Sequence, residues 1–194
     1  MMVEHIPWCG CQYQSGIEGQ KLAVVGYSHY WNPASDHDLV TRECVEKLIS
    51  GKWNGKERRF FSSVRNYFGF TEDSEFWPRV VFFNFLPNSV GDREAKFGGG
   101  TDEQVARGHD RFLSILAKEK PDKIFIFTQK GWDNCPPIEE KTPLALGSEF
   151  SRFSWGTYVV GGHFVKAFGL RHPQGADGEL MRRTVRHILS IPSK

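Results

Sequence analysis

Side chains suited to recognising a flat ring occur where strands are predicted to end. Asn84 offers an amide that both donates and accepts hydrogen bonds, and His172 offers an imidazole. Tyr30 and Trp31 offer aromatic rings that can stack on a base, and Ser28 lies just before them. Together these residue types predict a binding site for a planar heterocycle.

Several other chemistries lack their motifs. The chain has no Gly-Lys-Ser/Thr phosphate-binding loop, no glycine fingerprint for dinucleotides and no pair of histidines at metal-binding spacing. Its four cysteines are not spaced like a zinc ribbon, which favours reduced thiols, although an iron–sulfur cluster could use such scattered positions; they are Cys9, Cys11, Cys44 and Cys135. We therefore expect no kinase, dehydrogenase or zinc hydrolase, and no cofactor or metal.

Length and charge set further limits. With 194 residues and 39% hydrophobic content, the sequence predicts one domain spanning 1–194. Basic and acidic residues number 25 and 23, so any contact with nucleic acid must be a local patch. Glu4 and His5 stand where a secretory signal needs an apolar run, and no apolar run reaches membrane-spanning length. We expect a cytoplasmic protein with no membrane partner and no obligate protein partner.

Short apolar runs rich in β-branched and aromatic residues predict buried strands. They cover 21–26, 79–85, 123–128 and one or both of 157–160 and 164–168. Helical patterns fall between them, first over 35–49 with Ser35 as the expected cap, and then, less regularly, over 57–68.

Two later helices have clearer signals. Thr101 and Gln104 form a predicted capping box at the start of a helix over 102–118. A last helix over 178–189 is predicted to bury one apolar face, formed by Met181, Val185, Ile188 and Leu189. Its opposite face carries Arg182, Arg183 and Arg186.

Strands that alternate with helices indicate an α/β fold. We predict a three-layer α/β/α sandwich with a central four-stranded parallel sheet. Such sheets bind ligands outside the carboxyl ends of their strands. The loops expected there are 26–31, 84–88, 128–132 and 171–175. Trp132, in the third of these loops, is expected to pack in the core or at its rim.

Two of these loops carry short motifs. The chain reads Gly26-Tyr27-Ser28-His29-Tyr30 after the first strand and His172-Pro173-Gln174 after the last. At these positions it resembles the uracil-DNA glycosylase superfamily, which has Gly-Gln-Asp-Pro-Tyr or Gly-Glu-x-Pro-Gly in the first motif and His-Pro-Ser in the late loop. It is most similar to an uncharacterised bacterial group with Gly-Glu-Ser-His-Tyr, matching four of five positions. The order of elements agrees from about residue 22 to residue 189.

The resemblance implies binding of a nucleobase, uracil or a damaged base, in DNA, and its excision by N-glycosidic bond hydrolysis. It implies that His172 donates a hydrogen bond to the departing base and that the amide of Asn84 reads the base edge. Ser28 or His29 would position the water, although efficient members of the superfamily carry an aspartate where this chain has Ser28. Because no leucine wedge follows His172, single-stranded DNA is expected ahead of duplex.

Two alternatives stay open. The first is a module of the same fold that binds a nucleobase, a nucleotide or nucleic acid without cleaving it. The second is a serine hydrolase, because Ser28, an aspartate such as Asp92 or Asp133, and His172 follow a hydrolase chain order. Tyr30 stands where the hydrolase elbow requires glycine, which ranks this hypothesis third.

Overall fold

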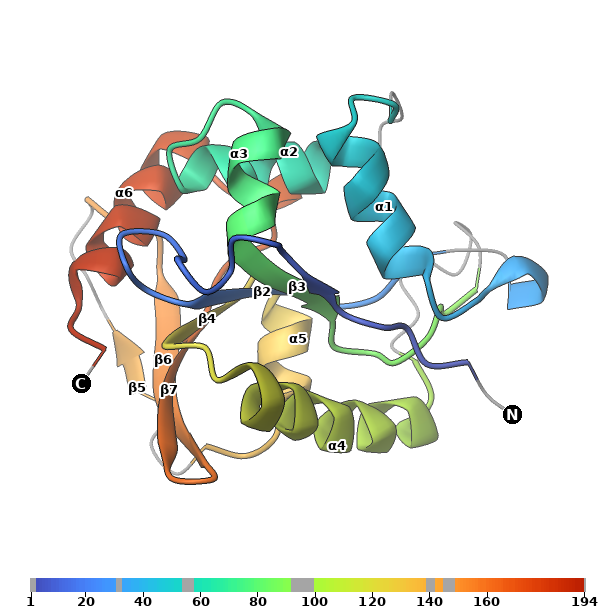
Figure 1. The fold of residues 1–194 in the computed structure, drawn as a ribbon. Coiled ribbons are helices and arrows are strands. Elements are labelled where there is room, and N and C mark those ends of the chain that lie inside the picture. The colour runs from blue at the N-terminus through green and yellow to red at the C-terminus, as the bar shows by residue number, and fades with distance from the viewer. Residues whose placement is uncertain are drawn as a thin grey trace.

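A computed structural model describes residues 3–30, 33–53, 58–91, 100–138, 142–144 and 149–193. Within them, seven strands form one sheet in the order β1-β3-β2-β4-β7-β6-β5 (Figure 1). The strands are β1 (Trp8–Cys9), β2 (Leu22–Gly26), β3 (Val80–Asn84), β4 (Lys123–Ile126), β5 (Thr142–Leu144), β6 (Phe153–Val160) and β7 (His163–Gly169). The predicted α/β class is confirmed.

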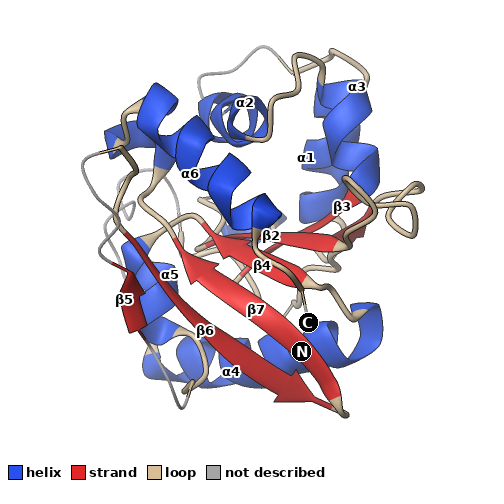
Figure 2. Cartoon of the chain, turned by 90° about the vertical axis from the view of Figure 1, so that its left-hand side faces the viewer, coloured by secondary structure: helices blue, strands red, loops and turns tan. Residues whose placement is uncertain are grey.

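Helices cover both faces of this sheet. One face carries α1 (Val40–Ile49), α2 (Arg58–Tyr67), α3 (Asp73–Phe76) and α6 (Gly178–Ser190), and the other carries α4 (Asp102–Glu119) and α5 (Gln129–Asn134) (Figures 1 and 2). Each interface has its own apolar cluster, because residues alternate between the two faces along each strand. Leu22 and Val24 face the first cluster, whereas Ala23 and Val25 face the second.

The sheet is larger than predicted and is mixed. Four neighbouring strands, β3, β2, β4 and β7, run parallel, whereas β1, β6 and β5 pair antiparallel with their neighbours. Between β6 and β7 lie only Gly161 and Gly162, both with positive φ. A two-residue turn of this kind joins antiparallel strands, so β6 extends the sheet instead of returning through a helix. The prediction of a sheet of four parallel strands is therefore wrong in extent and in the direction of the outer strands.

The four predicted helices form, with one shift at a start, whereas two short helices were not predicted: α3, and α5, which occupies most of the predicted loop 128–132. Thr101 and Gln104 form the predicted capping box of α4, and the predicted apolar face of α6 is buried. The helix expected to begin at Ser35 begins only at Val40. Of the residues between them, Asp36 makes a tertiary contact instead, because it accepts hydrogen bonds from the backbone N–H and the hydroxyl of Ser89. Ser35 belongs to a 3₁₀ turn, Pro33–Ser35, and does not cap α1.

One buried cation joins the sheet to the last helix. Lys123 is completely buried at the start of β4, and its Nζ donates hydrogen bonds to the carbonyls of Ile188 and Leu189 at 2.9 and 2.8 Å. It also donates to the carbonyl of Ile191, just past α6. The last carbonyls of a helix lack partners within the helix, so Lys123 caps the C-terminal end of α6.

Among the described residues, none of the helices combines the length and the apolar character needed to cross a bilayer.

Candidate functional site

The centre of the candidate site is the pair of strand ends at Gly26 and Asn84. The two residues are partners in the parallel ladder between β2 and β3. The Oδ1 atom of Asn84 lies only 2.2 Å from where a Cβ on residue 26 would stand, and only 5% of Asn84 is exposed. The amide therefore lies over Gly26, in space that any larger residue would fill.

A buried arginine holds this strand end. Arg111 of α4 donates from Nη1 to the carbonyl of Asn84 at 2.6 Å, and from Nη2 to the carbonyl of His5. Burial lowers the pKa of Arg111 to about 10, so the side chain is still a cation at neutral pH. This charge-assisted bond ties the backbone of Asn84 to α4 and to the N-terminal segment.

An aromatic ring from α2 borders the same space. The Cζ atom of Phe60 lies 3.8 Å from the Cβ position at Gly26, and its ring packs 6.2 Å from the ring of Phe82 in β3. Phe60 is half-buried, whereas its neighbour Phe61 is buried in the core. Phe60 is not among the residues predicted for the site. Consecutive residues on a helix point about 100° apart, so a Phe-Phe pair signals that one ring lies at the margin of the core.

His172 reaches this ring from the other side of the site. It lies in the exposed loop after β7, and its ring centroid is 5.7 Å from that of Phe60, with 34° between the planes. Its Nδ1 accepts a hydrogen bond from the backbone N–H of Gln174 at 3.2 Å. An acceptor nitrogen carries no proton, so the neutral ring has its proton on Nε2, which is then a donor.

Ser28 lies beyond the strand end, and its hydroxyl is engaged locally. Its Oγ donates to the carbonyl of His29 at 2.8 Å. The serine hydrolase hypothesis requires this hydroxyl to donate to the imidazole of His172 instead. Of the two aspartates considered for that hypothesis, Asp133 accepts a hydrogen bond from Gln129, and Asp92 lies outside the described residues.

His29 belongs to a buried cluster beside the N-terminal segment. Its Nε2 lies 2.9 Å from Oγ1 of Thr41 in α1, and its ring meets the ring of His5 edge-on at 5.2 Å. Desolvation lowers the pKa of His29 to about 3, and the positive charge that His5 acquires on protonation acts in the same direction. A neutral imidazole with so low a pKa is a weak proton acceptor, which disfavours His29 as the base that activates water.

The aromatic residues predicted to stack on a base have different outcomes. Tyr30, within the predicted loop 26–31, is 36% exposed, and partial burial raises its pKa. Trp31 lies outside the described residues. Trp132 is 3% exposed and packs over Gly169, where a Cβ would lie 2.4 Å from the indole, so its predicted packing role is confirmed.

The described residues contain no group of three His, Cys, Asp or Glu side chains arranged to hold a metal ion. The chemistry on offer is instead that of an amide, a phenyl ring and an imidazole N–H, which are linked through Phe60: its Cζ lies near Gly26, where the amide of Asn84 lies, and its ring contacts the ring of His172. An amide can read the edge of a heterocycle, a ring can stack on its face, and a fixed N–H can stabilise negative charge on it.

Of the predicted residues, Asn84 and His172 both adjoin Phe60, whereas His29 turns toward α1 and the N-terminal segment. Neither a scan against protein-family models nor a search of curated proteins found a match to this chain.

Proposed function

We propose that this protein binds a nucleobase, uracil or a damaged base, in single-stranded DNA, with a fold and site like those of the uracil-DNA glycosylase superfamily. The observation that carries the proposal is that Phe60 lies 3.8 Å from the Cβ position at Gly26, which the Asn84 amide covers, and that its ring also contacts the ring of His172. Three chemically different groups from β3, α2 and the loop after β7 are thus neighbours. A flat ring with polar edges is the ligand that such a set recognises.

The amide of Asn84 supplies the selectivity in this proposal. Uracil presents a carbonyl acceptor and an N–H donor side by side, and an amide matches both. Cytosine presents an amino donor and an unprotonated nitrogen at the corresponding atoms. To match them, the amide would have to exchange the positions of its oxygen and its nitrogen. The absence of a side chain at Gly26 allows the amide to lie there, and Arg111 holds the backbone carbonyl of Asn84.

Excision of the base is the second candidate function, and the tautomer of His172 favours it. Cleavage of the N-glycosidic bond leaves the bonding electron pair on the base, so negative charge builds on its oxygens. The Nε2–H of His172 is a donor suited to that charge, because Nδ1 is fixed as an acceptor by Gln174. Water then adds to the sugar carbon, and the proton that it loses ends on the departed base anion. Ser28 can orient this water through its oxygen, but it is a poor base, so we expect slow turnover.

The test combines binding with base release. Single-stranded oligonucleotides carrying one uracil or one cytosine are titrated by fluorescence anisotropy, and free base is measured after long incubation. We expect tighter binding of the uracil strand, and loss of that preference in Asn84→Ala. His163→Ala is the matched histidine control, because His163 lies in the β6–β7 hairpin and its Nε2 contacts the carbonyl of Pro121.

The outcomes separate the hypotheses. Uracil release that disappears in His172→Ala and Asn84→Ala, but not in His163→Ala, supports excision. Selective binding without release supports the binding module. Equal affinity for both strands in the unaltered protein contradicts the proposed function, and labelling of Ser28 by a fluorophosphonate probe would then favour the hydrolase.

A further inference from the structure

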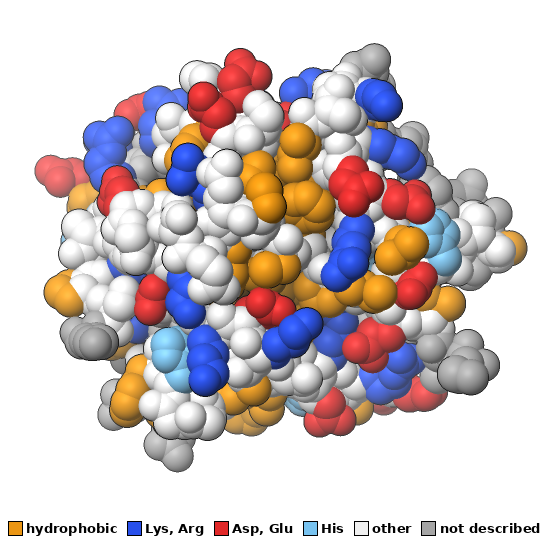
Figure 3. All heavy atoms as spheres, in the orientation of Figure 1, with side chains coloured by type: hydrophobic (Ala, Val, Ile, Leu, Met, Phe, Trp, Pro, Cys, Tyr) orange, Lys and Arg blue, Asp and Glu red, His pale blue; other side chains and the backbone are white. Residues whose placement is uncertain are grey.

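A second region of interest is a hollow that Arg111 helps to line, apart from Asn84, Phe60 and His172. The N-terminal segment and α4 border a hollow of about 200 Å³, with Ile6, Pro7 and Ile115 in its apolar wall. Its polar lining includes Arg42 of α1, Ser114 and Lys118 of α4, and the cysteine Cys9. Figure 3 shows lysine and arginine side chains on either side of an apolar strip between these elements. The space is large enough for a small molecule and is bordered by cations.

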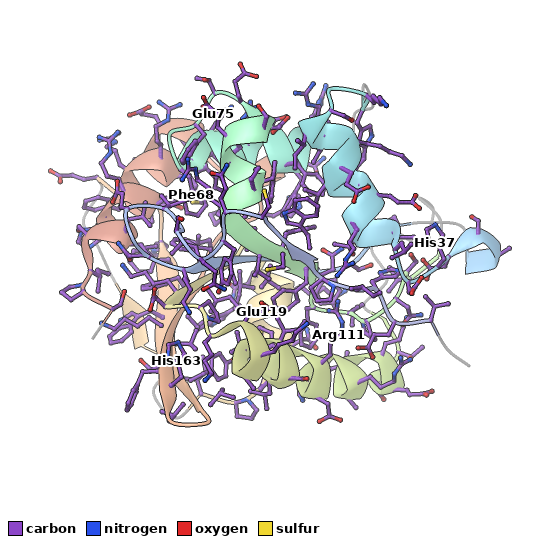
Figure 4. All side chains as sticks on the ribbon, in the orientation of Figure 1. His37, Phe68, Glu75, Arg111, Glu119 and His163 are labelled. Carbon is purple, nitrogen blue, oxygen red and sulfur yellow. The ribbon has the colours of Figure 1, made fainter. Side chains whose placement is uncertain are left out.

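The balance of charge in this hollow is positive. Its lining contains three cations, Arg42, Arg111 and Lys118, and two carboxylates, Glu4 and Glu119. Arg111 and Glu119 both extend from α4 toward the N-terminal segment (Figure 4). Glu119 is already engaged, because it accepts from the Cys9 thiol and pairs with Lys118 at 3.4 Å.

The unusual group beside the hollow is the buried Nε–H of Arg111, a residue of its lining. Only 5% of Arg111 is exposed, and its Nη atoms donate to the carbonyls of Asn84 and His5. Among the described residues, no acceptor lies within hydrogen-bond distance of Nε. The carboxylate of Glu4 stands 3.7 Å away, too far for a hydrogen bond, and its side chain is half-exposed. A buried charged donor without an acceptor is costly, which makes this N–H a strong attractor for an anion.

We propose that this hollow binds a small oxyanion, a phosphate or carboxylate group, which accepts a hydrogen bond from Nε of Arg111. The ion pairs with Arg42 and Lys118 at the rim and accepts from the hydroxyl of Ser114. Arg42 uses its Nε for the carbonyl of Pro7, so its terminal nitrogens are the atoms that would meet the ligand. The carboxylate of Glu4 competes with the ligand for the positive charge of Arg111. This proposal does not depend on the nucleobase function.

The hollow and the base site share one guanidinium. An anion on Nε of Arg111 and the carbonyl of Asn84 on Nη1 are bound by the same planar group. Occupancy of the hollow therefore fixes the plane of the guanidinium that supports Asn84. A phosphate group or carboxylate arriving here would reinforce the base site without entering it.

The test measures binding of inorganic phosphate, and separately of succinate, by titration calorimetry at constant ionic strength. In the double variant Arg42→Gln/Lys118→Gln, we expect the Kd of the anion that binds to rise at least about tenfold, because two charge-assisted contacts are lost. Both side chains are exposed, so the variant is expected to fold. Glu4→Gln removes the competing carboxylate and should tighten binding.

The control is Arg183→Gln/Arg186→Gln, which removes the same charge beside a separate, more open hollow on α6. Unchanged affinity in this control, with weakening in Arg42→Gln/Lys118→Gln and tightening in Glu4→Gln, supports the proposal. Absence of saturable binding of either anion overturns it. Equal weakening in both double variants, or no tightening in Glu4→Gln, also overturns it, because binding would then reflect overall charge.

Discussion

The ring of His172 lies 5.7 Å from the ring of Phe60, although the two residues come from a loop after β7 and from a helix that precedes β3. This contact helps to position the imidazole of His172, which lies in an exposed loop. The N–H of Gln174 holds the same ring through Nδ1. A group held by two such contacts is ready to donate a hydrogen bond without reorganising first.

Phe60→Ala is expected to weaken binding of a uracil-containing strand by about 1–3 kcal/mol, the usual value of one stacked base. The ring is half-buried, so the cost in folding free energy should be smaller than for Phe61→Ala, whose side chain is in the core. Anisotropy titration and urea unfolding measure the two effects. The exposed Phe164 of β7 gives the control, Phe164→Ala, with unchanged affinity. Equal losses in both variants would contradict the stacking role.

Gly26→Ala is expected to abolish the preference for uracil over cytosine. The new Cβ would lie 2.2 Å from Oδ1 of Asn84, which forces the amide out of its position. In Gly178→Ala the nearest atom to the new Cβ is 4.0 Å away, so that variant should bind like the unaltered protein. Retention of the preference in Gly26→Ala would mean that the Asn84 amide does not read the base.

Asn84→Asp should shift the preference from uracil toward cytosine. A carboxylate only accepts hydrogen bonds, so it repels the carbonyl of uracil and accepts from the amino group of cytosine. The ratio of the two dissociation constants, measured with the oligonucleotides described above, reports the shift. An unchanged ratio, with the fold intact by circular dichroism, would exclude base reading by residue 84.

The His172 ring should be the Nε2–H tautomer at neutral pH, since Nδ1 accepts from Gln174. Long-range ¹H–¹⁵N spectra distinguish a protonated from an unprotonated ring nitrogen. Gln174→Pro removes the donor N–H and should allow both tautomers. If Nδ1 carries the proton in the unaltered protein, the donor role assigned to Nε2 is lost.

Stability should fall as the pH is lowered below about 6.5. Desolvation lowers the pKa of His29 to about 3 and also lowers that of His5, whereas both titrate near 6.5 in the unfolded chain. Between these values the unfolded chain binds more protons, so the free energy of unfolding rises with pH and is lost on acidification. For His29 alone the change between pH 7 and pH 5 is about 2 kcal/mol.

Urea unfolding of His29→Gln at pH 7 and pH 5 tests this dependence. The difference between the two pH values should shrink by about the same 2 kcal/mol, because glutamine does not titrate. His163→Gln, which replaces a partly buried histidine at the β6–β7 hairpin, is the control for the substitution itself. Identical pH dependence in the unaltered protein and His29→Gln would show that His29 titrates normally.

Lys123→Met is expected to lower the free energy of unfolding by about 2–4 kcal/mol. The substitution keeps most of the side-chain volume but deprives three carbonyls near the end of α6 of their donor. Lys118→Met, at a position 80% exposed, should change stability by less than about 0.5 kcal/mol. Denaturant titration of both variants gives the comparison, and a similar small effect in both would contradict the capping role.

The elements that could be predicted from the sequence are those whose signals are local. Buried strands such as β2 and β4 are apolar runs, and α4 carries its capping box in its own first turn. β1 and β5 are two and three residues long, so no periodicity marks them, and they exist through pairing with β3 and β6. The Gly161-Gly162 turn did signal an antiparallel hairpin, but the sequence analysis gave it no weight.

The candidate site was predictable to a similar extent. Asn84 and His172 follow strands of one sheet, and the carboxyl ends of parallel strands meet at one edge, so their convergence on Phe60 follows from the fold class. The packing of α2 decides which of its aromatic side chains lies at that edge. No local pattern in the sequence therefore predicted Phe60. The direction of His29 depends on His5, far away in sequence, and no local pattern reveals such a contact.

The capping of α6 by Lys123 has a consequence for how the chain folds during synthesis. The lysine is made early, within β4, but the carbonyls that solvate it belong to residues 188, 189 and 191. Until these residues have left the ribosome exit tunnel, the ammonium of Lys123 lacks the carbonyls that accept its hydrogen bonds and must keep its water. The sheet face that α6 covers should therefore stay open to chaperones and proteases until α6 has emerged.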